Sequence, residues 1–286
     1  MPDRKKIIPY AVAVGVAAVL LAAAVIISGI PQKSGITETS ASSDENTVVT
    51  SRAPAETEAA TLPPVTEGTV IPPLDTGIPE LTVSEDVSSD EFSRDGVLLI
   101  SKFAVYPVFD GYDRVDLINA KIAETARSLT NISQYEKDLA LDDLSFSESS
   151  GIDFEASTYN TSFSSKQKNG ALSVLFETVL QGGGAAAAAT HRSLCFDLRS
   201  GELISLDVFT GRSSDAVTSY VVSRFSALIA SDPGTFYDNA SETVGASVSL
   251  YNFYITETGV AVFVRSGEIS PAAFGDITIE IPFEEL

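Results

Sequence analysis

The 24 residues at positions 7–30 carry no charged side chain, and this run limits what the chain can fold into more than any other feature. About 20 apolar residues in a helix span the roughly 30 Å hydrocarbon core of a bilayer. Three basic residues at positions 4–6 precede the run, and positive charge favours the cytoplasmic side of a membrane. We therefore expect a short cytoplasmic tail at residues 1–6, a single-pass anchor in the lipid bilayer of the cell membrane at residues 7–30, and an extracellular C-terminal domain.

A cleaved secretory signal peptide is the alternative interpretation of this run. Signal peptides usually have an apolar core of about 7–15 residues, which is shorter than the run found here. The small residues Ser28 and Gly29 are compatible with cleavage. A lipid anchor is excluded, because the one cysteine of the chain is Cys195. Both remaining interpretations place most of the chain outside the cytoplasm.

Residues 31–90 have the composition of a disordered linker. These sixty residues contain seven prolines, 18 serines and threonines, 11 acidic residues and no aromatic residue. Such a segment buries too little apolar surface to offset the entropy lost on ordering. We expect an acidic tether that holds a folded domain away from the membrane.

Residues 91–286 have the composition of a folded domain and contain all 15 phenylalanines. This region has 27 acidic and 13 basic side chains, a net charge of −14, so nucleic acid is not an expected partner. One cysteine and one histidine in the whole chain exclude an intramolecular disulfide, a cysteine-based zinc site and a multi-histidine metal site. We predict no cofactor and no metal.

The pattern of apolar residues predicts an α+β fold, with helices packed on one face of a mostly antiparallel sheet. Two halves are expected, at about 91–168 and 169–286. Strands are expected at 97–108, 154–165, 171–180, 191–198, 202–206, 253–255, 260–264 and 276–282. Helices are expected from Asp113 to Leu129, over 134–141, and after a cap at 213–215, whereas 235–250 has the composition of a loop.

Several short motifs resemble a family of bacterial extracytoplasmic domains. They include Tyr106-Pro107-Val108, Leu117–Ile122, Gly182–Gly184, Phe196–Ile204 and Ile281–Leu286. Their order is similar to that in the domain of unknown function found in the outer part of the anti-sigma factor RsiV and beside the catalytic domain of the deacetylase PdaC. The resemblance covers roughly residues 97–286.

The resemblance implies a membrane-tethered or secreted domain, and the RsiV member recognises lysozyme outside the cell. Residues 1–6 are too few for the sigma-binding segment of an anti-sigma factor, and a separate deacetylase domain is not expected. The family has a Gly-Gly-Ala-His turn. Here an alanine stands where that histidine is expected, and His191 lies five residues further on.

The loop Gly182, Gly183 and Gly184 together with His191 is the predicted ligand-binding surface, because exposed glycine loops often carry ligand contacts. His191 and Asp197 lie roughly 20 Å apart on a strand, so they are not expected to form a base and its orienting acid. We expect a buried, structural thiol at Cys195.

Two further groups of residues have both a structural and a functional interpretation. The acidic clusters 110–116 and 142–143 lack the spacing of a calcium loop, which favours solvated carboxylates. Five aromatic residues between positions 236 and 254 either line a sugar-binding face or pack in the core. They are Phe236, Tyr237, Tyr251, Phe253 and Tyr254.

These features predict a membrane-anchored extracytoplasmic binding or sensing module without catalytic activity. The expected ligand is an extracellular, lysozyme-like protein or a peptidoglycan strand of the cell wall. The alternatives are a carboxylate-dependent cell-wall hydrolase or an accessory domain of envelope modification, and a passive spacer.

Overall fold

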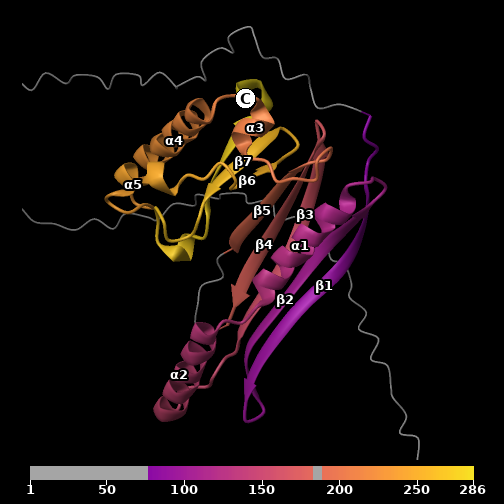
Figure 1. The fold of residues 1–286 in the computed structure, drawn as a ribbon. Coiled ribbons are helices and arrows are strands. Elements are labelled where there is room, and N and C mark those ends of the chain that lie inside the picture. Colours follow the sequence, from indigo (N-terminus) through magenta and orange to yellow (C-terminus); the bar gives the residue numbers. More distant parts are fainter. Residues whose placement is uncertain (1–76, 183–188) are drawn as a thin grey trace, which may run out of the picture. The chain divides into compact units, whose positions relative to one another are not determined.

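The computed structural model describes residues 77–182 and 189–286 (Figure 1). A five-stranded sheet has the order β1-β2-β3-β4-β5, and a three-stranded sheet has the order β6-β7-β8. The strands are β1 (Thr82–Arg94), β2 (Val97–Asp110), β3 (Ser157–Lys168), β4 (Ala171–Gln181), β5 (Ala189–Asp197), β6 (Phe253–Ile255), β7 (Gly259–Val264) and β8 (Ile277–Pro282). The helices are α1 (Val115–Thr130), α2 (Gln134–Ser150), α3 (Leu206–Thr210), α4 (Ser214–Ser231), α5 (Ala240–Ser247) and the short 3₁₀ helices η1 (Ala272–Phe274) and η2 (Phe283–Glu285).

The two sheets are antiparallel except for β2 and β3, which are parallel and joined through α1 and α2. The turn between β3 and β4 is Asn169-Gly170, and both residues have positive φ, 52° and 72°. This confirms the hairpin that the Asn-Gly pair predicts. The structure also confirms a mixed α+β fold with mostly antiparallel strands.

One face of the five-stranded sheet is covered by α1 (Figure 1). Ile118 and Ile122 of α1 are fully buried in a cluster with Phe176 of β4 and Phe196 of β5. Their spacing of four places them on one stripe of the helix, as the sequence indicates.

The opposite face of β4 and β5 packs against the three-stranded sheet. The backbone N–H of Ile255 in β6 donates to Ser173 Oγ of β4 at 3.1 Å. Helices α4 and α5 pack in the same core, where Val221 and Phe225 of α4 are fully buried. The prediction that all helices pack on one face of one sheet is therefore wrong. Instead, α1 and α2 pack on the first sheet, while α4 and α5 pack with the second.

Strand β1 differs from the sequence prediction. The predicted linker ends at Asp90, whereas β1 begins at Thr82 and pairs with β2 along its length. Most side chains of β1 are exposed, so its backbone bonds to β2 define it and no hydrophobic pattern indicates it. The remainder of the predicted linker up to residue 76, the predicted tail and the anchor at 7–30 lie outside the described residues. Within 77–182 and 189–286, no helix has both the length and the apolar character needed to cross a membrane.

Two smaller predictions are also wrong. The expected strand at 202–206 is reduced to a single bridge between Leu203 and Phe196. The expected loop at 235–250 contains α5, which buries only Ala240 and Val244. The rest of α5 consists of small or polar residues, so its apolar stripe is too short to stand out in the sequence.

Candidate functional site

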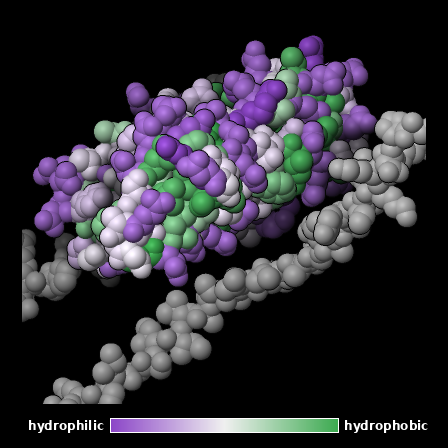
Figure 2. Space-filling model, turned by 90° about the horizontal axis from the view of Figure 1, so that it is seen from below, coloured by the Kyte–Doolittle hydropathy of each residue, from purple (hydrophilic) through white to green (hydrophobic). Residues whose placement is uncertain are grey.

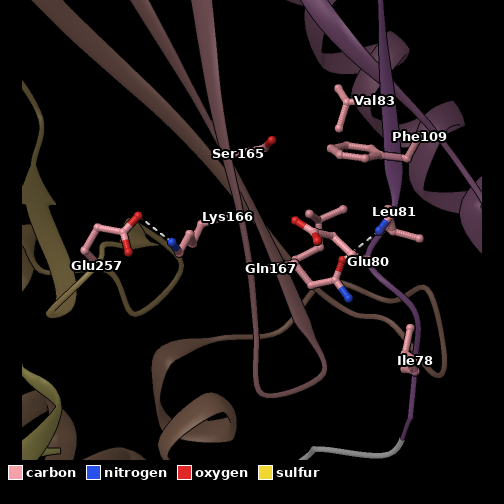
Figure 3. Close-up of a pocket in the computed structure, with 10 residues that line it drawn as sticks. Ile78, Glu80, Leu81, Val83, Phe109, Ser165, Lys166, Gln167 and Glu257 are labelled. Atoms are coloured by element: carbon pink, nitrogen blue, oxygen red, sulfur yellow. Dashed lines mark hydrogen bonds and ion pairs between the residues drawn. The ribbon is translucent and has the colours of Figure 1, made fainter.

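The parallel pairing of β2 with β3 ends at Ala104 and Thr161, and beyond this point the two strands no longer pair with each other. A hollow of about 500 Å³ is lined by residues of both strands beyond this point (Figure 3). Its lining also includes residues that precede β1 and the turn after β6. The lining consists of Ile78, Glu80, Leu81, Val83, Phe109, Ser165, Lys166, Gln167, Leu172 and Glu257.

Gln167 of β3 fixes one wall of this hollow. Its Nε2 donates to the carbonyl oxygen of Pro79 at 3.0 Å, and its Oε1 accepts the backbone N–H of Leu81 at 3.1 Å. The buried side chains of Phe109 and Leu172 supply apolar surface to the same hollow. The segment before β1 is thus held as part of the site by a side chain 86 positions away in the sequence.

A second hollow of about 260 Å³ lies between β3, β4 and the turn after β6. The two hollows share Ser165, Lys166 and Glu257. The lining of the second hollow consists of Ser164, Ser165, Lys166, Ser173, Leu175, Tyr254, Ile255, Thr256 and Glu257. The two hollows are therefore neighbours, and we call them together the β3–β6 groove.

An ion pair between Lys166 and Glu257 stands where the two hollows meet (Figure 3). The hydrogen bond from Lys166, followed by its charge, lowers the pKa of Glu257, so the carboxylate is ionised at neutral pH. The side chain of Glu257 is 82% exposed, and exposed ion pairs contribute little stability. A ligand in the groove can therefore separate this pair at low cost.

Tyr254 connects the second hollow with the environment of His191. The two rings stack with centroids 6.5 Å apart. Burial raises the pKa of Tyr254, and the charges of Glu280 and Glu177 add to that effect, so its hydroxyl stays protonated. The half-buried ring offers an apolar face, and its hydroxyl can donate a hydrogen bond.

His191 is held between two carboxylates. Its Nδ1 lies 3.2 Å from Asp276 Oδ2, and its Nε2 lies 3.5 Å from Glu177 Oε2. Asp276 also accepts the backbone N–H groups of His191 at 2.5 Å and of Ser266 at 2.7 Å. Its carboxylate is 2% exposed. The cluster therefore ties β5 of the first sheet to the segment that precedes β8 of the second.

The stability of the fold should depend on pH through this cluster. The hydrogen bond with Asp276 raises the pKa of His191, although burial opposes it, and the charges of Asp276 and Glu177 add to the rise. The stabilisation is complete below about pH 6.5, the pKa of histidine in an unfolded chain, and is lost as pH rises through the raised pKa. We expect the native chain to exceed the His191→Gln variant in free energy of unfolding most at about pH 6. Urea titrations between about pH 6 and 9 should show this difference shrinking, and a difference that grows would refute the assignment.

Of the predicted ligand-binding residues, the structure describes Gly182 and His191, and it places these two apart. Gly182 has φ of +82°, and a Cβ there would lie 2.2 Å from the carbonyl oxygen of Ala156, so only glycine fits. Gly183 and Gly184 lie outside the described residues. His191 pairs with Glu177, five positions before Gly182, roughly 17 Å along the strand.

The structure also places Cys195 and Asp197, the other candidate residues of β5. Burial raises the pKa of the Cys195 thiol to about 12, which confirms a structural, unreactive cysteine. Asp197 accepts the backbone N–H of Arg199 at 2.8 Å and is not a partner of His191. Within the described ranges, no group of three or more His, Cys, Asp or Glu side chains is arranged to hold a metal ion.

The five aromatic residues divide between the two interpretations. Phe236 and Phe253 are buried in the core, and Tyr237 and Tyr251 are exposed. Tyr254 lines the second hollow. Sequence reasoning missed Lys166 and Glu257, because they are 91 positions apart and no local motif links them.

Residues 207–284, from α3 to η2, match a family described as a protein of unknown function, DUF3298. This stretch is a DUF3298 domain. The match does not distinguish the RsiV and PdaC type from other members of this family. The assignment to that type therefore stays a prediction. The chain matches no curated protein sequence.

Two solved structures of DUF3298 family members are similar to this chain. One from Bacteroides fragilis is 18% identical, with a TM-score of 0.47, over 71% of this chain and 91% of that protein. One from Pseudomonas aeruginosa is 13% identical, with a TM-score of 0.41, over 73% of this chain and 94% of that protein.

Proposed function

We propose that this chain is a membrane-anchored extracytoplasmic module that binds a cell-wall glycan in the β3–β6 groove. The observation that supports this most is the pair of neighbouring hollows that share Lys166 and Glu257. The anchor at residues 7–30 and the acidic tether would hold the domain outside the membrane. The resemblance to RsiV- and PdaC-type domains agrees with a place in the cell envelope.

The size and chemistry of the groove favour a saccharide over a folded protein. Small-ligand sites usually occupy about 300–1,000 Å³, and the larger hollow occupies about 500 Å³. A stable protein interface instead buries about 800 Å² of each partner. Hydroxyl, amide, carboxylate and ammonium groups line the groove beside the apolar surfaces of Phe109 and Tyr254. Sugars present both hydroxyl groups and apolar ring faces, so they match this combination.

Each part of the groove has a role in this proposal. Tyr254 supplies a ring face against which a pyranose packs. Ser165 and Glu257 supply a hydroxyl and a carboxylate for the hydroxyl groups of the sugar, and Lys166 donates to its oxygens. The hydrogen bonds of Gln167 keep the wall in place without ligand. Binding then requires only the exposed Lys166–Glu257 pair to adjust.

Calorimetric titration of the full chain with an oligomer of N-acetylglucosamine tests this proposal. We expect saturable binding and no new reducing ends in the same mixture after prolonged incubation. New reducing ends would favour the hydrolase alternative. Binding of lysozyme without binding of the oligosaccharide would favour a protein ligand, and binding of neither would contradict the proposal.

A further inference from the structure

Helix α2 carries three large apolar side chains on its solvent side. Tyr135, Leu139 and Phe146 are 76%, 49% and 65% exposed. Their spacing of four and seven residues places them on one stripe of the helix. Just beyond the helix, Ile152 is 61% exposed. We call the three helical residues the α2 stripe.

The α2 stripe is not required for packing α2 onto the sheet. The opposite side of the helix already buries Ala140, and Leu141 and Leu144 pack against the buried Leu99 and Ile100 of β2. Soluble proteins seldom expose contiguous large apolar side chains without an interaction that covers them. The α2 stripe is therefore a second apolar face, on a helix whose first apolar face packs against the sheet.

Both ends of α2 are fixed, so the α2 stripe is a preformed surface. At the N-terminus, Ser133 and Glu136 form a capping box, and Glu136 also accepts from Lys102 Nζ at 2.6 Å. At the C-terminus, Gly151 adopts the left-handed conformation, with φ of 65°. A preformed helical surface loses little conformational entropy when it binds a partner.

Carboxylates flank the α2 stripe. At 100° per residue, Asp138 and Asp142 lie on one side of the stripe and Asp143 on the other. The one basic residue of α2, Lys137, has its Nζ 5.6 Å from the centroid of the Phe92 ring and so faces the sheet. Figure 2 views the domain from the side on which α2 lies in Figure 1, and shows hydrophobic side chains gathered among hydrophilic ones. The solvent side of α2 is thus apolar along its centre and negative along its edges.

This charge pattern decides between the possible occupants. A second copy of the same surface would place carboxylates against carboxylates, and an anionic bilayer would be repelled. An amphipathic helix with lysine or arginine beside its own apolar stripe matches both features. We infer that the α2 stripe docks a cationic amphipathic helix of a partner protein. This site is distinct from the β3–β6 groove, so it does not depend on the proposed glycan ligand.

Fluorescence anisotropy tests the inference with a labelled, 18-residue amphipathic helical peptide made of leucine and lysine. The full chain is compared with the double variant Leu139→Gln, Phe146→Gln, which keeps the charge of α2. We expect binding to the variant to be at least about tenfold weaker, because most binding free energy comes from a few central apolar side chains. A peptide with glutamate in place of lysine should not bind to the native chain.

The matched control is the double variant Leu117→Gln, Phe274→Gln, because each of these side chains is 55% exposed and lies outside α2. Unchanged affinity in this control supports the site, whereas equal weakening in both double variants overturns it. A native dimer that becomes monomeric in the α2 variant would show that a second copy is the occupant and would also overturn it. If circular dichroism shows that the α2 variant is unfolded, Asp142→Lys with Asp143→Lys replaces it, and the same tenfold loss is expected.

Discussion

Replacing Phe225 by alanine should lower the free energy of unfolding by about 3–5 kcal/mol. Phe225 is fully buried in α4, within the core that also contains Phe253 of β6 and Val262 of β7. Removal of the ring leaves a cavity that neighbouring side chains fill only partly, so transfer and packing energy are both lost. Urea denaturation of the native chain and the variant measures the loss.

Phe146→Ala is the matched control, because the same chemical change occurs at a side chain that is 65% exposed. We expect a change within about 0.5 kcal/mol for this control. A loss at Phe225 as small as that of the control would mean that α4 does not pack against the three-stranded sheet as described. A small effect at Phe146 would also show that the α2 stripe is not held for stability.

The second large effect is expected at the ion pair between Lys102 and Glu136. Lys102 Nζ donates to Glu136 Oε1 at 2.6 Å and to the carbonyl oxygen of Asn131 at 3.0 Å. Only 9% of the lysine side chain is exposed, compared with 28% of the glutamate side chain. Glu136→Ala leaves a buried ammonium without its counter-charge, so the free energy of unfolding should fall by about 3 kcal/mol or more.

Lys102→Met should cost far less, within about 1 kcal/mol, because it removes the buried charge and keeps the apolar stem. The remaining Glu136 carboxylate still accepts the backbone N–H of Ser133 at 2.8 Å. Glu136→Ala should therefore lower the free energy of unfolding more than Lys102→Met does. Thermal or urea denaturation of both variants measures this order, and a larger loss in Lys102→Met would contradict it. Glu136→Gln separates the charge from the cap, since its amide oxygen can still accept from Ser133.

The elements with a strong apolar period were predicted correctly. Helices α1 and α4 follow stripes at three- and four-residue spacing, and Ser213 caps α4 by accepting the N–H of Ala216. The hairpin at Asn169-Gly170 follows from local turn chemistry. In each case the information lies within a few neighbouring residues, which is where sequence patterns are reliable.

The missed features depend on contacts between distant parts of the chain. Strand β1 is polar and exposed, and only its pairing with β2 defines it. The β3–β6 groove forms because β2 and β3 separate after Ala104 and Thr161, and this register is not visible in one sequence. The sequence points to His191, but its partners Glu177 and Asp276 come from another strand and from the segment before β8.

The most direct test of the proposed glycan site is to fill the β3–β6 groove with one bulky side chain. Ser165 is exposed and lines both hollows, so Ser165→Trp should occupy the groove without removing a core contact. Ser162→Trp is the matched control, because Ser162 is exposed on the same strand and lines neither hollow. Calorimetric titration with the N-acetylglucosamine oligomer should show at least about tenfold weaker binding for Ser165→Trp and native affinity for Ser162→Trp. Native affinity in Ser165→Trp would contradict the assignment of the groove as the ligand site.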